Sequence, residues 1–274
     1  MKVAVVQMVS GADVNANLQT ADRLLTQAAQ AGAELVILPE YFCLIGDSDV
    51  QKLTIQESYG AGPLQDFLSD AAKTHGVWLV GGTIPVATQA QGPGERVYNT
   101  SLTFDPTGAC VARYDKIHLF KYDNGRERYD ESEVLCAGET PVTFDVDSRD
   151  GRSWRVGMSV CYDLRFPELY RQYADAGAHL LLAPSAFTYT TGQEHWELLL
   201  RARAVENLAF MAAAAQGGRH DNGRRTWGHA MLVDPWGAVL AQHPEGASMV
   251  VADLDFQRLL DCRSRLPALE HRGL

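Results

Sequence analysis

The segment KVAVVQMV at residues 2–9 and the apolar run ELVIL at residues 34–38 decide the class of fold. Both runs are rich in valine, isoleucine and leucine, which is typical of strands buried in a sheet. Residues 15–31 lie between them and carry an apolar stripe at helical spacing, formed by Leu18, Ala21, Leu25 and Ala28. The order strand, helix, strand predicts an α/β domain.

The same alternation continues along the chain. Residues 64–75 and 169–176 have helical patterns, and each is followed by an extended apolar run, at residues 77–84 and 179–183. The sequence shows neither a linker-like change of composition nor an obvious short repeat. We therefore expect residues 1–274 to form a single layered domain.

Two turn sequences indicate that the sheet is mixed rather than purely parallel. FDPTG at residues 104–108 and VDPWG at residues 233–237 each join two strand-like runs, which predicts hairpins. The polar residues 121–138, which include Glu131, have no clear period and are expected to form a long excursion outside the sheet. Long loops of compact domains are often functional.

Composition excludes several classes of partner. The chain of 274 residues is 46% hydrophobic and can bury a sizeable core. Its formal net charge of -10 repels polyanions, so we expect binding neither to nucleic acid nor to a membrane.

The first apolar run meets Gln7 and Gly11 too early for a signal peptide or a spanning helix. Five cysteines without a C-x-x-C pair fit reduced thiols, which predicts a cytoplasmic protein without a zinc ribbon.

Cys161 ends an apolar strand in the segment VGMSVCYDLRFPE at residues 156–168, and a helix is expected to follow within a few residues. A nucleophile at such an elbow projects from the end of the strand. Nearby backbone N–H groups can then face the negative oxygen that forms when the nucleophile attacks a carbonyl. By itself, Cys161 fits a buried structural thiol equally well.

Three charged residues stand in comparable positions. Glu40 follows the strand LVILP, where a carboxylate next to aromatic residues could work as a general base. Lys116 lies in the strand-like segment RYDKIHLF, where a desolvated ammonium could lower the pKa of a cysteine or stabilise an oxyanion. Glu131 lies in the loop segment YDES. Each of them singly also fits an ordinary surface charge.

The joint order of these motifs is specific. LPEY at residues 38–41, YDKIHL at 114–119, DES at 130–132 and CYDLRFPE at 161–168 together resemble the nitrilase superfamily of carbon-nitrogen hydrolases. The resemblance spans nearly the whole chain. Later blocks similar to those of the family are TGQEHWE at 191–197, RARAVEN at 201–207 and GHAMLVDPWG at 228–237.

The resemblance implies a four-layer α-β-β-α sandwich with mixed sheets. It implies a catalytic triad of Glu40, Lys116 and Cys161, supported by Glu131 as a second glutamate. It also implies a homodimer or larger homo-oligomer, and a reaction that needs neither a metal nor an organic cofactor. The partners expected are a small-molecule amide and water.

The mechanism implied is amide hydrolysis through a thioester. Glu40 would accept the thiol proton, Cys161 would attack the carbonyl, and Lys116 with the backbone N–H of Tyr162 would hold the oxyanion. Glu40 would then protonate the leaving ammonia and activate water, while Glu131 positions the lysine or the substrate. Arg165 would either brace the elbow or meet a substrate carboxylate.

Substrate is a separate question, because members of the superfamily share the triad and differ in the pocket. The stretch AAAAQGGRH at residues 212–220 resembles most closely the branch that hydrolyses deaminated glutathione. The ω-amidase branch, which acts on 2-oxoglutaramate and 2-oxosuccinamate, shares SAFT-x-TTG, here at residues 185–192. Residues 121–130 depart from both branches and are expected to shape the pocket. A nitrilase or carbamoylase is a further alternative, and a catalytically silent binding subunit is the alternative from another class.

One further pattern has a simpler explanation than the chemistry it suggests. His195 and Glu197 form an H-x-E pair without a third metal ligand at standard spacing, so no metal site is expected. Glu197 and Arg201 stand four residues apart on an expected helix, where an ordinary ion pair accounts for both.

Overall fold

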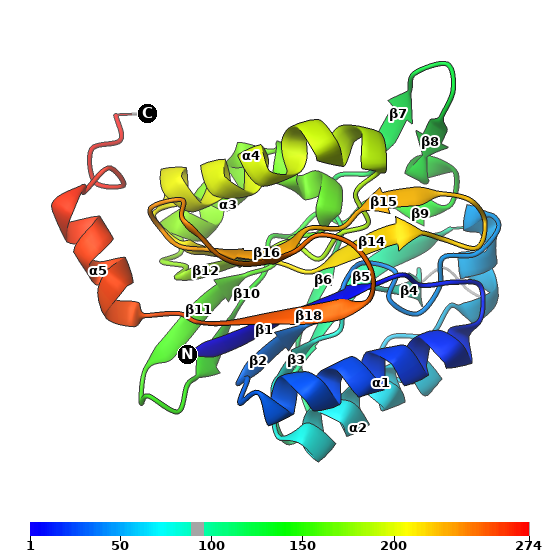
Figure 1. Ribbon diagram of the computed structural model, residues 1–274, viewed down its shortest axis with the longest axis horizontal. Helices are drawn as coiled ribbons and strands as arrows, with labels where there is room; N and C mark the ends of the chain where they lie inside the picture. The colour runs from blue at the N-terminus through cyan, green and yellow to red at the C-terminus, as the bar shows by residue number, and fades with distance from the viewer. Residues whose placement is uncertain (89–95, 274) are drawn as a thin grey trace.

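A computed structural model describes residues 1–88 and 96–273 of the protein. Two large β-sheets pack face to face, and a pair of helices covers the outer face of each sheet (Figure 1). Helices α1 (Val14–Gln30) and α2 (Pro63–His75) cover one sheet, and α3 (Pro167–Asp175) and α4 (Tyr189–Asn207) cover the other. The predicted α-β-β-α sandwich is confirmed. A last helix, α5 (Phe256–Arg265), lies at one end of the molecule.

The first sheet has ten strands and is mixed. Parallel strands β1, β2 and β3 form its centre, with β14 parallel to β1, while β5 and β18 run antiparallel to their neighbours β3 and β1. Its strands are β1 (Lys2–Met8), β2 (Leu35–Ile37), β3 (Trp78–Val80), β4 (Ile84–Ala87), β5 (Val97–Phe104), β6 (Cys110–Asp115), β9 (Leu135–Cys136), β14 (Ala215–Arg219), β15 (Arg225–Trp227) and β18 (Ser248–Asp253).

The second sheet has six strands in the order β10-β11-β12-β13-β16-β17. Strands β11, β12 and β13 are parallel, and the others run antiparallel to their neighbours. Its strands are β10 (Thr143–Asp147), β11 (Ser153–Gly157), β12 (Leu180–Leu182), β13 (Phe210–Ala213), β16 (Ala230–Val233) and β17 (Val239–His243). Both predicted hairpins form, between β5 and β6 and between β16 and β17.

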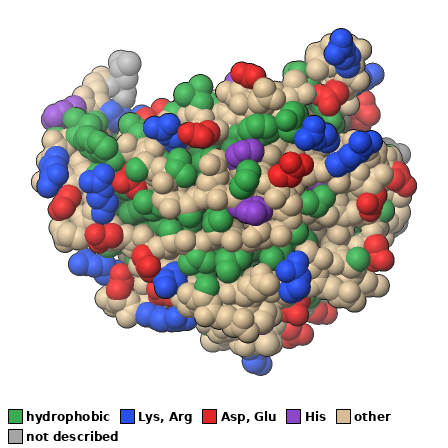
Figure 2. Space-filling model, in the orientation of Figure 1, with side chains coloured by type: hydrophobic (Ala, Val, Ile, Leu, Met, Phe, Trp, Pro, Cys, Tyr) green, Lys and Arg blue, Asp and Glu red, His purple; other side chains and the backbone are tan. Residues whose placement is uncertain are grey.

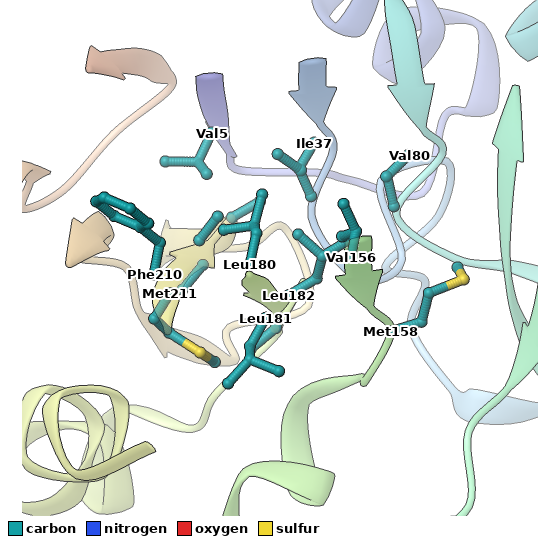
Figure 3. Packing of buried hydrophobic residues seen from close by; sticks show 14 of the residues in the cluster. Val5, Ile37, Val80, Val156, Met158, Leu180, Leu181, Leu182, Phe210 and Met211 are labelled. Carbon is teal, nitrogen blue, oxygen red and sulfur yellow. The ribbon is translucent and has the colours of Figure 1, made fainter. Parts of the chain in front are cut away.

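The main core lies between the two sheets. Val5, Ile37 and Val80 of the first sheet point toward Leu180 and Leu182 of the second (Figure 3). Side chains alternate along a strand. The neighbouring residues Ala4, Val36 and Leu79 of the first sheet therefore point to its outer face, where they pack beneath α1 and α2. Burial on both faces explains why these strands are apolar without alternation.

Two predictions from the sequence need correction. Residues 77–84 form two strands, since the chain leaves the sheet at Gly81, Gly82 and Thr83 before β4. Gly82 has a φ of +54°, and a Cβ there would lie 2.1 Å from the carbonyl oxygen of Pro39, so the backbones meet only because this residue is glycine.

The second correction concerns residues 121–138. They contain an antiparallel hairpin of β7 (Lys121–Asp123) and β8 (Arg128–Asp130), which projects from the body of the protein (Figure 1). The short helix η2 (Glu131–Glu133) follows, and strand β9 then returns to pair with β5 of the first sheet. The predicted excursion therefore ends before residue 135.

The distribution of charge on the surface and the length of the helices can be compared with the expectation that the protein binds neither nucleic acid nor a membrane. Basic and acidic side chains are interspersed over the face drawn in Figure 2. Within the described part of the chain, every helix is too short or too polar to cross a membrane.

Candidate active site

The structure brings Glu40, Lys116, Glu131 and Cys161 together. Glu40 follows β2 and Lys116 follows β6, so both lie at the same edge of the first sheet. Cys161 begins the short helix η3 (Cys161–Arg165), after β11 of the second sheet, and Glu131 begins η2. Glu40, Lys116 and Cys161 are buried, with exposed fractions of 1%, 0% and 7%. The joint motif order thus corresponds to one cluster between the two sheets.

Lys116 is the centre of this cluster. Its Nζ atom lies 2.9 Å from Oε1 of Glu40, and 2.9 and 2.8 Å from the two carboxylate oxygens of Glu131. Burial by itself would lower the pKa of Lys116, but the carboxylates of Glu131 and Glu40 raise it well above its ordinary value. Burial by itself would raise the pKa of Glu131, whereas Lys116 and a backbone hydrogen bond lower it overall. Both groups are therefore charged at neutral pH.

Glu40 is held by donors on both oxygens. The Nδ2 of Asn99 donates to Oε1 at 2.9 Å, and the backbone N–H of Ala186 donates to Oε2 at 2.8 Å. Asn99 lies on buried strand β5 and was missed by the sequence reasoning, although a polar residue in an otherwise buried strand is a usable signal. With Lys116, Oε1 has two donors and Oε2 has one.

Glu131 is held equally firmly. Tyr41 donates to its Oε1 at 2.9 Å, and the backbone N–H of Phe120 donates to its Oε2 at 2.7 Å. Tyr41 has a φ of 56°, a left-handed conformation that is unusual for a residue other than glycine. Strain of this kind persists where surrounding contacts impose it, and here it turns the tyrosine toward Glu131.

Cys161 adopts the predicted elbow. Its φ is 51°, and its backbone N–H donates to the carbonyl of Pro184 at 3.1 Å. Burial and the neighbouring Glu40 raise the pKa of its thiol well above the ordinary value of 9.0, while Lys116 lowers it by less. The net direction is opposite to the one expected from the sequence. The thiol therefore keeps its proton until a base removes it.

A small pocket opens beside these groups. It is lined by Glu40, Phe120, Glu131, Cys161, Tyr162, Ala186, Phe187, Thr188, Thr191 and Arg224. A thiol, two carboxylates and the guanidinium of Arg224 therefore line the same small, largely apolar space, an arrangement typical of a catalytic site.

Comparison with known proteins agrees with this geometry. Residues 2–264 match the family described as carbon-nitrogen hydrolase. The chain belongs to the carbon-nitrogen hydrolase family. It is 38% identical to the deaminated glutathione amidase of Synechocystis sp., over 98% of this chain and 97% of that protein. It is 36% identical to the omega-amidase of Danio rerio, over 99% of this chain and 94% of that protein.

A solved structure supports the family at the level of the fold. A Saccharomyces cerevisiae protein, described as a member of branch 10 of the nitrilase superfamily, superposes with a TM-score of 0.86 at 33% sequence identity. The match covers 100% of this chain and 97% of that one.

Of two further predicted residues of this carbon-nitrogen hydrolase, Tyr162 lines the pocket and Arg165 packs behind it. The ring of Tyr162 lines it and meets the ring of Phe120 edge-on at 5.1 Å. The guanidinium of Arg165 lies 5.9 Å from the ring centre of Tyr162 and 5.4 Å from that of Phe187. Arg165 thus packs against two aromatic side chains that line the pocket. Its role as a brace or as a carboxylate ligand stays a prediction.

Asp163, within the cysteine motif of this carbon-nitrogen hydrolase, is a functional-site residue that the sequence did not predict. Its buried carboxylate accepts hydrogen bonds from Tyr114 Oη at 2.6 Å, from the N–H of Val160 at 2.9 Å and from the N–H of His118 at 3.0 Å. Tyr114 and His118 flank Lys116 in sequence. One carboxylate therefore ties the lysine segment to the cysteine elbow.

The H-x-E pair has ordinary contacts. Nδ1 of His195 lies 3.3 Å from a guanidinium nitrogen of Arg165, and Glu197 forms an ion pair with Arg201 on α4 at 3.3 Å. Over residues 1–88 and 96–273, no group of three or more His, Cys, Asp or Glu side chains is arranged to hold a metal ion.

Proposed function

We propose that this carbon-nitrogen hydrolase is an amidase that cleaves small, carboxylate-bearing linear amides through a thioester on Cys161, with deaminated glutathione as its substrate. The observation that carries the proposal is the position of Lys116, fully buried between Glu40 and Glu131 beside the thiol. Burying a cation and two carboxylates carries a desolvation penalty that lowers stability. Clusters of this kind are common at functional sites, where the chemistry requires them.

Glu40 is the general base in this proposal. Its Oε1 already accepts from Asn99 and Lys116, whereas Oε2 accepts only from Ala186. A carboxylate oxygen offers two acceptor sites, so Oε2 has one site left for the proton of Cys161. Because the raised pKa of the thiol keeps that proton in place, proton removal accompanies attack on the carbonyl.

The oxyanion of the tetrahedral intermediate is stabilised by Lys116 and by the backbone N–H of Tyr162. Removal of one such donor typically slows turnover roughly 100- to 1000-fold. Glu131 holds Lys116 in place with both of its oxygens. Glu40 returns its proton to the leaving nitrogen, and then activates the water that hydrolyses the thioester.

The leaving group depends on the amide. Ammonia, the leaving group expected from the sequence, is released from a primary amide such as 2-oxoglutaramate. Deaminated glutathione carries its scissile nitrogen on cysteinylglycine, so that dipeptide is the leaving amine. Its hydrolysis is therefore measured by dipeptide release rather than by ammonia.

Substrate choice rests on similarity to the Synechocystis amidase, whose name states deaminated glutathione. The Danio rerio omega-amidase supports 2-oxoglutaramate or 2-oxosuccinamate as the alternative. Glu40, Glu131 and Cys161 line one pocket, and Lys116 pairs with both carboxylates behind it, which favours an enzyme over a silent binding subunit. A nitrilase or carbamoylase is supported by the shared chemistry alone.

The test is a turnover panel of deaminated glutathione, 2-oxoglutaramate, aliphatic amides, N-carbamoyl amino acids and nitriles. We expect deaminated glutathione to have the highest kcat/KM and Cys161→Ala to abolish turnover. Cys43→Ala is the matched control, because Cys43 is a buried thiol in the small core beneath α1 and α2. Activity that survives Cys161→Ala would refute the mechanism.

We further propose that residues 1–274 form one catalytic domain that works as a homodimer in the cytoplasm. Leu198 and Val205 of α4 and the nearby Trp236 are 67%, 44% and 53% exposed in the single chain, which suits burial against a second copy. All five cysteines are free, as a reducing compartment would keep them. Sedimentation analysis of the protein and of Leu198→Glu tests the dimer.

A further inference from the structure

Arg224 occupies the boundary between two spaces. It lines the pocket that contains Cys161, and it also lines a wider depression next to it. We call this depression the vestibule; it lies between the β7–β8 hairpin, residues 46–49 and residues 222–224. A substrate that reaches from the thiol into the vestibule has to pass this arginine.

The guanidinium of Arg224 is held in place but not neutralised. One of its terminal nitrogens donates to the carbonyl of Ala186 at 3.3 Å, and its Cζ lies 5.0 Å from the ring centre of Tyr129 on the hairpin. Its Nε is buried without a hydrogen-bond partner among the described residues. Across the same residues, no Asp or Glu oxygen lies within 4.0 Å of Arg224. An unpaired, partly buried guanidinium is suited to bind an anion.

Two of the acidic residues that line the vestibule have partners other than Arg224. Asp49 forms an ion pair with Lys52, and Glu127 accepts a hydrogen bond from Thr190 at 3.1 Å. Neither residue forms an ion pair with Arg224, so its guanidinium can still bind an anionic ligand.

Ala186 shows which half of the substrate meets Arg224. Its N–H donates to Oε2 of Glu40 at 2.8 Å, while its carbonyl accepts from Arg224. Ala186 alone therefore lies between Glu40, which protonates the leaving nitrogen, and the guanidinium of Arg224. The leaving nitrogen must face Glu40, so a substituent on it that extends past Ala186 reaches Arg224 and the vestibule.

We propose that Arg224 binds a carboxylate on the amine half of the substrate and makes the protein select amides of amino acids or peptides over primary amides. This inference rests on the proposed function, because it takes Cys161 as nucleophile and Glu40 as proton donor. In deaminated glutathione the amine half ends in a glycine carboxylate, whereas 2-oxoglutaramate releases ammonia and has no such group.

The experiment compares kcat/KM for three substrates: deaminated glutathione, its C-terminal carboxamide and 2-oxoglutaramate. We expect the wild-type protein to prefer the acid over the carboxamide by roughly 10- to 100-fold, the effect of a hydrogen bond between charged groups. Arg224→Gln should bring this ratio to about one, and Arg224→Lys should give an intermediate ratio. Because the ratio is measured within each variant, partial loss of folded protein does not change it.

Arg225→Gln is the matched control. Arg225 follows Arg224 directly and begins strand β15; it lies over the ring of Tyr189 at 3.9 Å and pairs with Glu245 at 3.8 Å. We expect it to keep the wild-type ratio of acid to carboxamide.

Three results would overturn the inference. The first is a wild-type ratio near one, with 2-oxoglutaramate still hydrolysed, which leaves the proposed function intact. The second is an Arg224→Gln variant that loses as much activity on 2-oxoglutaramate as on deaminated glutathione, which places the bound carboxylate on the acyl half. The third is no turnover of any of the three amides by the wild-type protein, which removes the proposed function and the role of Arg224 together.

Discussion

Replacement of Lys116 by methionine separates the stability of the buried cluster from its catalytic role. Wild-type Lys116 is fully buried and pairs with Glu40 and Glu131 at 2.9 and 2.8 Å, so the three side chains carry a net charge of one negative unit. Lys116→Met leaves two carboxylates facing each other without a cation. Removal of one partner from a buried ion pair typically costs about 3–5 kcal/mol. In a protein of this size that corresponds to a fall in Tm of roughly 6–20 °C.

The double variant Lys116→Met/Glu131→Gln restores a single negative charge in the same space. We expect it to recover about half or more of the lost stability in calorimetry, whereas turnover stays at least roughly 100-fold below wild type because the oxyanion donor is missing. Lys121→Met is the control, since Lys121 pairs with Asp130 at 2.7 Å on the exposed hairpin and should leave Tm nearly unchanged. A Lys116→Met protein that melts within about 2 °C of wild type would show that the buried cation does not stabilise the cluster. A double variant no more stable than the single one would show that repulsion between the two carboxylates is not the cause of the loss.

Three more outcomes are expected. Because burial raises the pKa of Cys161 well above 9.0, its alkylation by iodoacetamide, followed by mass spectrometry, should keep rising above pH 9; a plateau near neutrality would contradict this. Gly157→Ala should destabilise the protein by about 1–3 kcal/mol in urea titrations, since a Cβ would lie 2.7 Å from the ring of Tyr173; a neutral change would show that the ring moves freely. Burial lowers the pKa of His179 from 6.5 to about 4. The unfolded chain therefore takes up this proton first, and stability falls between pH 6.5 and 4 by about 1 kcal/mol for this partly exposed ring. His179→Gln should flatten that slope in urea titrations at several pH values.

Local patterns in the sequence accounted for much of the fold. The apolar runs that became β1 and β2, and the stripe that became α1, could be predicted because burial on one or both faces imposes a period on the residues themselves. The β7–β8 hairpin was missed, although Asn124-Gly125 at its tip is a common hairpin signal.

Motifs in the sequence indicated which four residues to expect close together, whereas the contacts that hold them come from distant segments and could not be predicted. Glu40 and Cys161 follow recognisable strands, but Asn99 reaches Glu40 from a strand far along the chain. The hydrogen bonds of Asp163 to His118 likewise join segments that only the fold brings together. The direction of the thiol pKa depends on burial, which no local pattern of residues states.

The pairing of the first strand with the last has a consequence for biosynthesis. β2 is synthesised soon after β1 and pairs with it, but the other edge of β1 is covered by β14 and by β18, which are synthesised much later. Until then an apolar strand with unpaired backbone groups stays open to other nascent chains, a situation that favours misassembly. Truncation before residue 248 should therefore reduce the yield of soluble protein even though every residue of the catalytic cluster is present.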